Sequence, residues 1–409
     1  MERDIDKSLP KQGYLDFDEY IRQGEPGKKE KAENWQTAIG LQAVDGLQVS
    51  DYLIQTARRH IEGEITSAEV RQLIKEYYSV KAEREPDDEE RQEADDVSNN
   101  IQEILAANTI DFTCRGYISL HRNIFHGVFK HAGKLRTYDI TKKEWVLEGD
   151  TVNYLNWEDL RRALDYDIEQ ERQFSYKGIS QDEIVTHIAH FVSGLWQIHP
   201  FGEGNTRTTA VFTIQYLRFL GFKVENDLFA KHSWYFRNAL VRANYKSAVK
   251  GIDYSPVYLE RFFRNLLLGE KWDLRNRYLH IHPTTEWSVQ PNMADPTSTG
   301  QAPDKHPTST RQAPDKHPTS TRQAPDKFHT ENLNIIKLVQ VIGEQQVSVK
   351  EMMSIMGLKD RENFLNLYLT PAISAGFVRL LYPESPRHPR QKYFLTVKGL
   401  ALYNQICKG

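Results

Sequence analysis

The stretch His199-Pro-Phe-Gly-Glu-Gly-Asn-Thr-Arg207 sets the interpretation of this chain of 409 residues. It contains an imidazole, a carboxylate, an amide, a guanidinium and two glycines, a mixture that suits phosphate chemistry. Apolar residues recur at helical spacing on both sides of it, over residues 182–198 and 208–220. The pattern therefore predicts a loop between two helices. The free N–H groups and the positive dipole end of the second helix favour an anion in that loop.

Each polar residue of the loop suits one part of phosphate chemistry. His199 can take a proton from a hydroxyl nucleophile because imidazole titrates near neutral pH. Glu203 offers the hard oxygen ligand that Mg²⁺ prefers beside substrate phosphates, and Arg207 can bind phosphate oxygens in a fork. Gly204 and Asn205 tolerate the left-handed conformations that turn successive N–H groups toward an anion. The loop therefore predicts a site for a magnesium nucleotide.

These residues resemble the signature of the Fic family, His-x-Phe-x-[Asp/Glu]-Gly-Asn-Gly-Arg-x-x-Arg, whose members mostly transfer AMP from ATP to a protein hydroxyl. Upstream, residues 120–137 resemble the family segment that ends in Ala-Gly-x-x-Arg. Downstream, residues 233–245 resemble the helix that closes the nucleotide pocket. The resemblance covers about residues 100–270. It implies a mainly α fold, a helical bundle with a β-hairpin flap from about Tyr138 to Val152.

By this resemblance the chain is a protein adenylyltransferase that uses ATP and Mg²⁺. His199 would be the general base toward a target Ser, Thr or Tyr, and Glu203 would hold Mg²⁺ on the phosphates. The nucleotide-binding residues would be Gly202, Gly204, Asn205, Thr206 and Arg207. The flap would hold an extended segment of the protein substrate by main-chain pairing, with self-modification as one outcome.

Two positions depart from the family signature. Thr206 stands where the family has a second glycine, and Ala210 stands where it has a final arginine. A β-branched residue does not tolerate positive φ, so Thr206 is expected in an ordinary conformation. The lost arginine removes a cation that the family uses on the γ-phosphate. A phosphotransferase, or a transferase of another nucleotide, therefore stays open as an alternative.

Residues 35–50 and 56–69 resemble the small helical antitoxins of two-component Fic systems, which makes the chain similar to a fused toxin–antitoxin pair. The family's inhibitory motif is [Ser/Thr]-x-x-x-Glu-[Gly/Asn], and Leu41 to Gly46 is its expected position here, with Asp45 in place of Glu. The usual arginine partner is missing. Either the inhibition is weak, or Asp45 pairs with another cation such as Arg207. The alternative is that these helices are only a scaffold.

Charge and cysteine content exclude few function classes. The chain has 53 Lys and Arg against 56 Asp and Glu, a net charge of −3, which argues neither for nor against nucleic acid. The acidic run over residues 83–96 is interpreted as a solvated helical face. Cys114 and Cys407 have no metal-site or disulfide spacing. No stretch reaches transmembrane length and the first residues lack an apolar signal core, so we expect a cytoplasmic, bacterial protein without a membrane partner.

Composition divides the chain into four expected regions. From Pro296 an 11-residue unit with two prolines repeats almost three times, which predicts an extended, disordered linker. The expected regions are a helical antitoxin-like part at residues 1–98 and the Fic catalytic domain at residues 99–287. The linker follows at residues 288–327, and a winged-helix-like domain at residues 328–409.

The last region has the element order of a winged helix. Three helical patterns lie at residues 331–342, 348–356 and 361–376. Two strand patterns follow at residues 377–382 and 392–396. A winged helix binds DNA or docks proteins, and the sequence leaves both open, together with the formation of a homodimer. A nucleotide-binding regulator that acts through this domain on DNA is therefore a further alternative.

Overall fold

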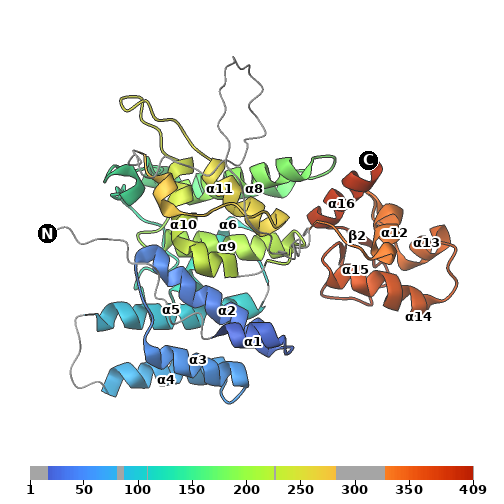
Figure 1. The fold of residues 1–409 in the computed structure, drawn as a ribbon, viewed down its shortest axis with the longest axis horizontal. Coiled ribbons are helices and arrows are strands. Elements are labelled where there is room, and N and C mark those ends of the chain that lie inside the picture. Colours follow the sequence, from blue (N-terminus) through green and yellow to red (C-terminus); the bar gives the residue numbers. More distant parts are fainter. Residues whose placement is uncertain (1–16, 81–86, 108, 225–226, 282–327, 409) are drawn as a thin grey trace, which may run out of the picture.

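The computed structural model describes residues 17–80, 87–107, 109–224, 227–281 and 328–408. Helices form nearly all of the regular structure in these residues, and the sheet that they contain has two strands (Figure 1). The predicted mainly α fold class is therefore confirmed. Within the same residues, no helix is both long enough and apolar enough to span a bilayer.

The N-terminal unit, residues 17–80, is a group of helices that buries its own apolar cluster. It comprises α1 (Asp18–Gln23), α2 (Lys28–Gly40), the 3₁₀ turn η2 (Leu41–Asp45), α3 (Asp51–Glu62) and α4 (Ser67–Val80). Trp35, Leu53 and Ile74 are fully buried in this cluster. Ser50 caps α3 by accepting a hydrogen bond from Leu53 N at 3.0 Å.

The central bundle, residues 88–281, surrounds one buried helix. Its helices are α5 (Asp88–Ala107), α6 (Cys114–Ile124), α7 (Leu160–Gln173), α8 (Gln181–Ile198), α9 (Asn205–Phe219), α10 (Asp227–Ala243) and α11 (Val257–Phe263). Short turns are η3 (Trp145–Leu147), η4 (Trp157–Asp159), η5 (Arg264–Leu268) and η6 (Asn276–Leu279). All residues of α9 from 205 to 217 are buried, and α6, α8 and η2 pack on it. The expected boundary at 98/99 falls inside α5, which packs along both α2 and α6.

The predicted helix–loop–helix is present. α8 begins at a capping box, in which Ser180 Oγ accepts from Glu183 N at 3.2 Å and Glu183 accepts from Ser180 N at 2.6 Å. It ends at Ile198, and α9 begins at Asn205, three residues earlier than the apolar pattern indicated. The earlier start follows from Gly204, whose φ of 74° lets it serve as the N-terminal cap.

The segment from Tyr138 to Val152, predicted as a β-hairpin, is a loop with one 3₁₀ turn, η3. Glu144 N donates to Asp150 O at 2.9 Å, so the loop folds back on itself without a strand ladder. Val146 and Leu147 are fully buried and anchor the loop in the main core. A two-stranded hairpin is only marginally stable, and here buried apolar side chains hold the segment instead.

The C-terminal unit, residues 328–408, has the predicted order of helices and strands. It comprises α12 (Leu333–Ile342), α13 (Val349–Ile355), a third helix built from α14 (Arg361–Phe364), η7 (Leu365–Leu369) and α15 (Thr370–Ser374), then β1 (Val378–Leu380), β2 (Tyr393–Leu395) and α16 (Val397–Lys408). The strands are antiparallel, with Val378 opposite Leu395. The last helix, α16, was not predicted. The expected linker, residues 288–327, lies outside the described residues.

The C-terminal unit meets the central bundle through a close backbone contact. A Cβ atom on Gly376 would lie 2.1 Å from Gly221 O, and one on Gly221 would lie 2.3 Å from Gly376 O. Both glycines also have positive φ, 95° at Gly221 and 78° at Gly376. Beside them, Lys398 N donates to Leu220 O at 3.3 Å. The two backbone segments approach this closely because neither glycine carries a side chain.

Candidate active site

His199 is held at the end of α8 in a strained backbone conformation. Its φ of 49° lies in the left-handed region, which Glu148 alone shares among the described non-glycine residues. The imidazole lies among aromatic rings, with its centroid 4.1 Å from that of Tyr154 and 5.3 Å from that of Trp196. His199 is only 2% exposed. The tight turn therefore buries the residue that the sequence identified as a base.

Burial favours the neutral form of the His199 imidazole. Neither Nδ1 nor Nε2 has a hydrogen-bond partner in the described part of the chain. Burial lowers the pKa of His199 well below 6.5, and the positive charges of Lys142 and Arg136 lower it further. A neutral imidazole with a free nitrogen is the form that accepts a proton.

Asn205 and Gly204 shape the loop between α8 and α9. The amide of Asn205 accepts a hydrogen bond from Phe201 N at 2.9 Å and donates to Phe201 O at 2.7 Å. A Cβ atom on Gly204 would lie 2.2 Å from the ring of Phe125, so glycine is required there by space as well as by φ. The side chain of Asn205 therefore fixes the loop conformation, which leaves main-chain groups to meet an anion.

The first turn of α9 supplies these main-chain donors. Thr208 N donates to Gly204 O at 3.0 Å, which is the first hydrogen bond of the helix. The N–H groups of residues 205–207 therefore have no carbonyl partner within the helix. Across the loop, a Cβ atom on Gly202 would lie 2.9 Å from the hydroxyl of Tyr138. The loop thus faces the flap on one side and a helix N-terminus on the other.

The two departures from the family signature are buried. Thr206 adopts a helical conformation, as expected for a β-branched residue, and its Oγ1 accepts a hydrogen bond from Trp196 Nε1 at 3.0 Å. Ala210 is fully buried in the core. The hydroxyl of Thr206 therefore ties α9 to α8 through the indole of Trp196.

Arg207 is buried and surrounded by partners from the N-terminal unit and α5. Its Nε lies 2.7 Å from Asp45 Oδ2, and its two terminal nitrogens donate to Gln42 at 3.0 Å and Glu93 at 2.8 Å. The guanidinium also lies over the ring of Phe125, 4.8 Å from the centroid. The arginine is only 2% exposed. Each of the three guanidinium nitrogens thus lies against a polar side chain of this protein, and only the two terminal nitrogens donate hydrogen bonds.

Asp45 lies where the inhibitory motif was expected. It pairs with Arg207, which the sequence analysis named as an alternative cation. The pair brings η2 against the first turn of α9. Gln42 and Glu93 were not predicted as part of the site. Glu93 belongs to the acidic run that was interpreted as a solvated face, and that interpretation is wrong for Glu93 and for the fully buried Asp95.

Glu203 is exposed and faces the flap. Its Oε2 lies 3.4 Å from Nζ of Lys142, and the Glu203 side chain is 57% exposed. The described residues contain no group of three or more His, Cys, Asp or Glu side chains arranged to hold a metal. A single carboxylate fits Mg²⁺ only when substrate phosphates supply further ligands, so the residues present suit a metal bound together with a nucleotide.

Arg136 is a structural residue of the site that the sequence identified only as part of a family segment. Its Nε donates to His199 O at 2.9 Å, and a terminal nitrogen donates to Tyr138 O at 2.6 Å. It also donates to Leu155 O. Arg136 therefore joins the loop between α8 and α9 to the flap. Its place in the Ala-Gly-x-x-Arg segment was the available signal.

Comparisons with known families match two separate stretches of the chain. The Fic/DOC family matches residues 111–217, which run from just before α6 into α9. The C-terminal domain of the Fic-like family, "Filamentation induced by cAMP protein Fic-like", matches residues 334–396 in the C-terminal unit.

Several curated relatives are protein adenylyltransferases by name. Protein adenylyltransferase VbhT of Bartonella schoenbuchensis is 23% identical over 200 residues, which cover 46% of this chain and 40% of that protein. The probable protein adenylyltransferase y4lH of Sinorhizobium fredii is 28% identical over 39% of this chain and 79% of its own length. Fic of Escherichia coli is 26% identical over 28% of this chain and 55% of its own length. The chain thus spans less than two thirds of the VbhT and Escherichia coli proteins.

Solved structures with lower similarity are also known. A Fic family protein from Desulfovibrio desulfuricans has a TM-score of 0.37 and 15% identity, covering 93% of this chain and 94% of that chain. The N-terminal Fic domain of a VirB-translocated Bep effector protein from Bartonella quintana has a TM-score of 0.34 and 18% identity, covering 45% and 84%. From the sequence matches, the chain contains a Fic domain at residues 111–217 and a Fic-like C-terminal domain at residues 334–396.

Proposed function

We propose that this chain transfers AMP from ATP to a hydroxyl side chain of a protein target, with Mg²⁺ as cofactor. The observation that carries the proposal is the neutral, unpartnered imidazole of His199 at one end of a loop that leads to the N-terminus of α9. Such an imidazole can accept a proton from a hydroxyl that attacks a phosphate bound at the helix end. The names of the relatives support the same reaction.

In the proposed reaction, the target hydroxyl oxygen forms a bond to the α-phosphorus of ATP. The bond from that phosphorus to the bridging oxygen breaks, and pyrophosphate leaves with the electron pair. His199 takes the hydroxyl proton. Glu203 would hold Mg²⁺, which neutralises charge on the phosphates. The N–H groups at the start of α9 would bind phosphate oxygens, and Asn205 would keep the loop in the shape that presents them.

We further propose that the N-terminal unit restrains the reaction by engaging Arg207. Two carboxylates and an amide lie against the guanidinium and occupy the space in which phosphate oxygens would bind it. Asp45 and Gln42 both lie in η2, so the restraint depends on how η2 packs against α9. Displacement of η2 would expose the arginine to the nucleotide.

Labelled nucleotides test the proposed reaction. The full chain is incubated with Mg²⁺ and ATP carrying the label on either the α- or the γ-phosphate, and protein-bound label is measured. Label from the α-phosphate that disappears with His199→Ala supports adenylylation. Label from the γ-phosphate alone supports phosphotransfer, and label only from α-labelled GTP, CTP or UTP supports another nucleotide. No label from any of them contradicts transfer and favours a nucleotide-binding regulator.

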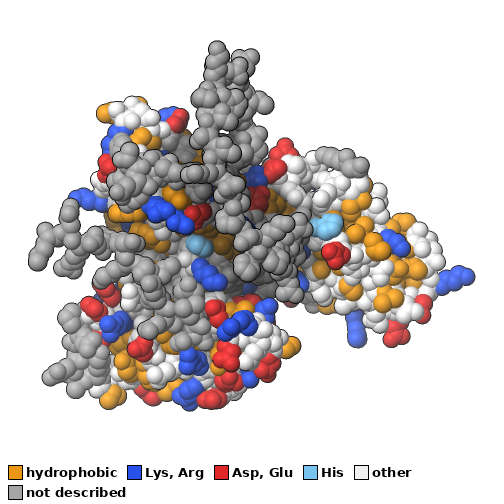
Figure 2. All heavy atoms as spheres, in the orientation of Figure 1, with side chains coloured by type: hydrophobic (Ala, Val, Ile, Leu, Met, Phe, Trp, Pro, Cys, Tyr) orange, Lys and Arg blue, Asp and Glu red, His pale blue; other side chains and the backbone are white. Residues whose placement is uncertain are grey.

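Docking of proteins fits the C-terminal unit better than DNA binding. On the face drawn in Figure 2, hydrophobic side chains gather over the C-terminal unit, and Lys and Arg are scattered over it. Leu333 is 69% exposed, Ile355 63% and Leu367 52%. DNA affinity depends mainly on clustered cations that neutralise phosphates. We propose that this unit docks other proteins.

We also propose that the protein is located in the cytoplasm.

A further inference from the structure

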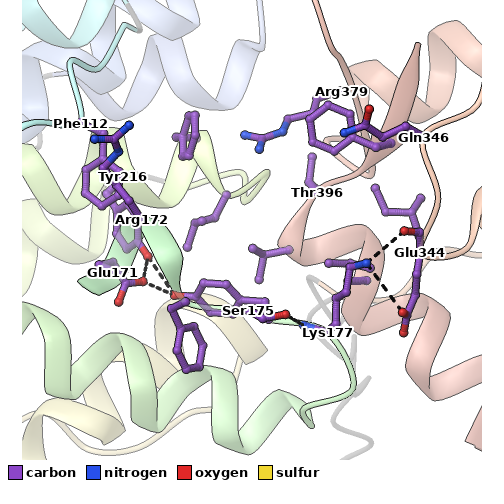
Figure 3. Close-up of a pocket in the computed structure, with 18 of the residues that line it drawn as sticks. Phe112, Glu171, Arg172, Ser175, Lys177, Tyr216, Glu344, Gln346, Arg379 and Thr396 are labelled. Atoms are coloured by element: carbon purple, nitrogen blue, oxygen red, sulfur yellow. Dashed lines mark hydrogen bonds and ion pairs between the residues drawn. The ribbon is translucent and has the colours of Figure 1, made fainter. Parts of the chain in front are cut away.

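A cavity of about 600 Å³ lies between the C-terminal end of α9 and the C-terminal unit (Figure 3). Phe112, Tyr216 and Phe219 line it from the central bundle. Arg379 in β1, Phe394 in β2 and Thr396 just after β2 line it from the C-terminal unit. Its size is in the range of cavities that hold small organic ligands. It lies at the opposite end of α9 from the loop that contains His199.

Arg379 is a partly buried cation without an anionic partner in the described part of the chain. Its side chain projects from β1 (Figure 3). The guanidinium carbon lies 4.7 Å from the centroid of the Phe219 ring and 4.6 Å from that of the Phe394 ring. The Nε atom is buried and has no hydrogen-bond acceptor there. Burial lowers the pKa of Arg379, with no carboxylate to oppose the shift.

The other charged residues that line the cavity have polar partners, and Asp111 accepts a hydrogen bond from Thr113 Oγ1 at 2.8 Å. Arg172 donates to Glu169 at 2.9 Å, and Lys177 donates to the main-chain oxygen of Glu344 at 3.2 Å. Glu171 accepts hydrogen bonds from Tyr176 at 2.7 Å and from Tyr216. Each of these charged side chains therefore has a hydrogen-bond partner within the protein. Ring faces offset the charge of Arg379 only in part, since a cation–π contact is worth about 0.5–2 kcal/mol.

The wall near Arg379 is aromatic. The rings of Phe112 and Tyr216 are stacked, with centroids 5.1 Å apart and planes 24° from parallel. The ring of Phe219 lies 6.2 Å from that of Phe112. A flat apolar group can pack against these rings, and an acidic group on it would meet the free guanidinium.

We propose that this cavity binds a small organic anion with a planar apolar body, whose carboxylate or phosphate pairs with Arg379. The ligand contacts the central bundle through its apolar body and the C-terminal unit through its acidic group. It therefore joins the two units and stabilises their contact. Uncharged ligands of the same shape leave Arg379 unpaired and bind less well.

Three probes on the full chain test the proposal: 2-naphthoate, 2-naphthyl phosphate and the neutral 2-naphthamide. Isothermal titration gives the affinities, and thermal unfolding gives the shift in Tm. At least one of the two anions should bind and raise Tm, and the naphthamide should bind about 10- to 100-fold more weakly, the effect of one charge-assisted contact. The relative affinities of the two anions tell whether carboxylate or phosphate is preferred.

Variants of Arg379 give the matching comparison. Arg379→Met should weaken anion binding by about 10- to 100-fold, and Arg379→Lys should retain part of the affinity. Arg387→Met, at an exposed position between β1 and β2, should change nothing. The naphthamide comparison needs only the wild-type chain, so it stands even if Arg379→Met unfolds. The proposal is overturned if neither anion binds the wild-type chain, if the naphthamide binds as tightly as the anions, or if a folded Arg379→Met binds them unchanged.

Discussion

Asp45 Oδ2 lies 2.7 Å from Nε of Arg207, and this contact joins the 3₁₀ turn of the N-terminal unit to the first turn of α9. The arginine is buried, whereas the Asp45 side chain is 29% exposed. The carboxylate therefore approaches the cation from the surface. An ion pair with that geometry can be released by movement of η2 alone, while Arg207 stays in the bundle.

Loss of the restraint on Arg207 should raise activity. Asp45→Asn and Glu93→Gln each remove one carboxylate from the guanidinium, and charge-assisted contacts of this kind are worth about 1.5–3 kcal/mol. We expect each variant to increase α-labelling several-fold, and the double variant to increase it further. Glu90→Gln, an exposed neighbour on α5, is the control and should leave labelling unchanged. Equal labelling in the wild type, the two single variants and the double variant would rule out restraint through Arg207.

The pH dependence of labelling should reflect the lowered pKa of His199. An imidazole whose pKa is well below 6.5 stays neutral across pH 6.5 to 8, so protonation of the base does not slow the reaction there. We expect a flat rate in this range and a decline only at lower pH, measured as initial labelling rates in buffers of constant ionic strength. A decline centred on pH 6.5 would mean that the imidazole is solvated in the working enzyme.

The buried carboxyl of Asp95 should make the stability of the N-terminal unit pH-dependent. Asp95 accepts hydrogen bonds from Ser50 Oγ at 2.6 Å and Tyr78 at 2.9 Å, and burial raises its pKa to about 7. Between pH 4 and 7 the folded state therefore holds a proton that the unfolded state has lost. The free energy of unfolding should fall as pH rises through this range, by on the order of 1–3 kcal/mol.

Urea unfolding at pH 5 and pH 8 measures this effect. Asp95→Asn keeps the size of the side chain and cannot ionise, so the variant should lose the part of the pH dependence that Asp95 contributes. The comparison between wild type and variant removes the contribution of all other groups. Identical pH dependence in both proteins would show that Asp95 does not titrate in this range.

The contact between Lys142 and Glu203 should compete with the metal. Nζ lies 3.4 Å from the carboxylate, and Mg²⁺ needs the same oxygens. Lys142→Met should therefore lower the Mg²⁺ concentration for half-maximal labelling, by up to about fivefold, since exposed ion pairs are worth roughly 0–1 kcal/mol. Lys143→Met, at the exposed neighbouring position, is the control. A higher Mg²⁺ requirement in Lys142→Met would show that the lysine assists the nucleotide rather than opposing the metal.

The sequence predicted the local parts of the site well. The helical spacing on both sides of the loop is a property of short segments, and α8 and α9 follow it closely. The conformation of Thr206 also follows from its own side chain. These features need no information from distant residues, which explains why they could be found.

Contacts between distant segments were found less reliably. Glu93 lies in a run of charges that indicates solvent exposure, and only the packing of α5 against α2 and α9 turns it toward Arg207. The flap was expected as a hairpin, but burial of Val146 and Leu147 decides its conformation. The roles of the site residues and the domain boundaries stay predictions.

The contact between Gly221 and Gly376 limits which substitutions the protein can accept at these two positions. A single methyl group at either position would meet the main chain of the other. A substitution there leaves every catalytic side chain in place and yet separates the C-terminal unit from the bundle. Inherited variation at these two glycines would therefore act on the contact between the C-terminal unit and the bundle, at a distance from the loop that contains His199.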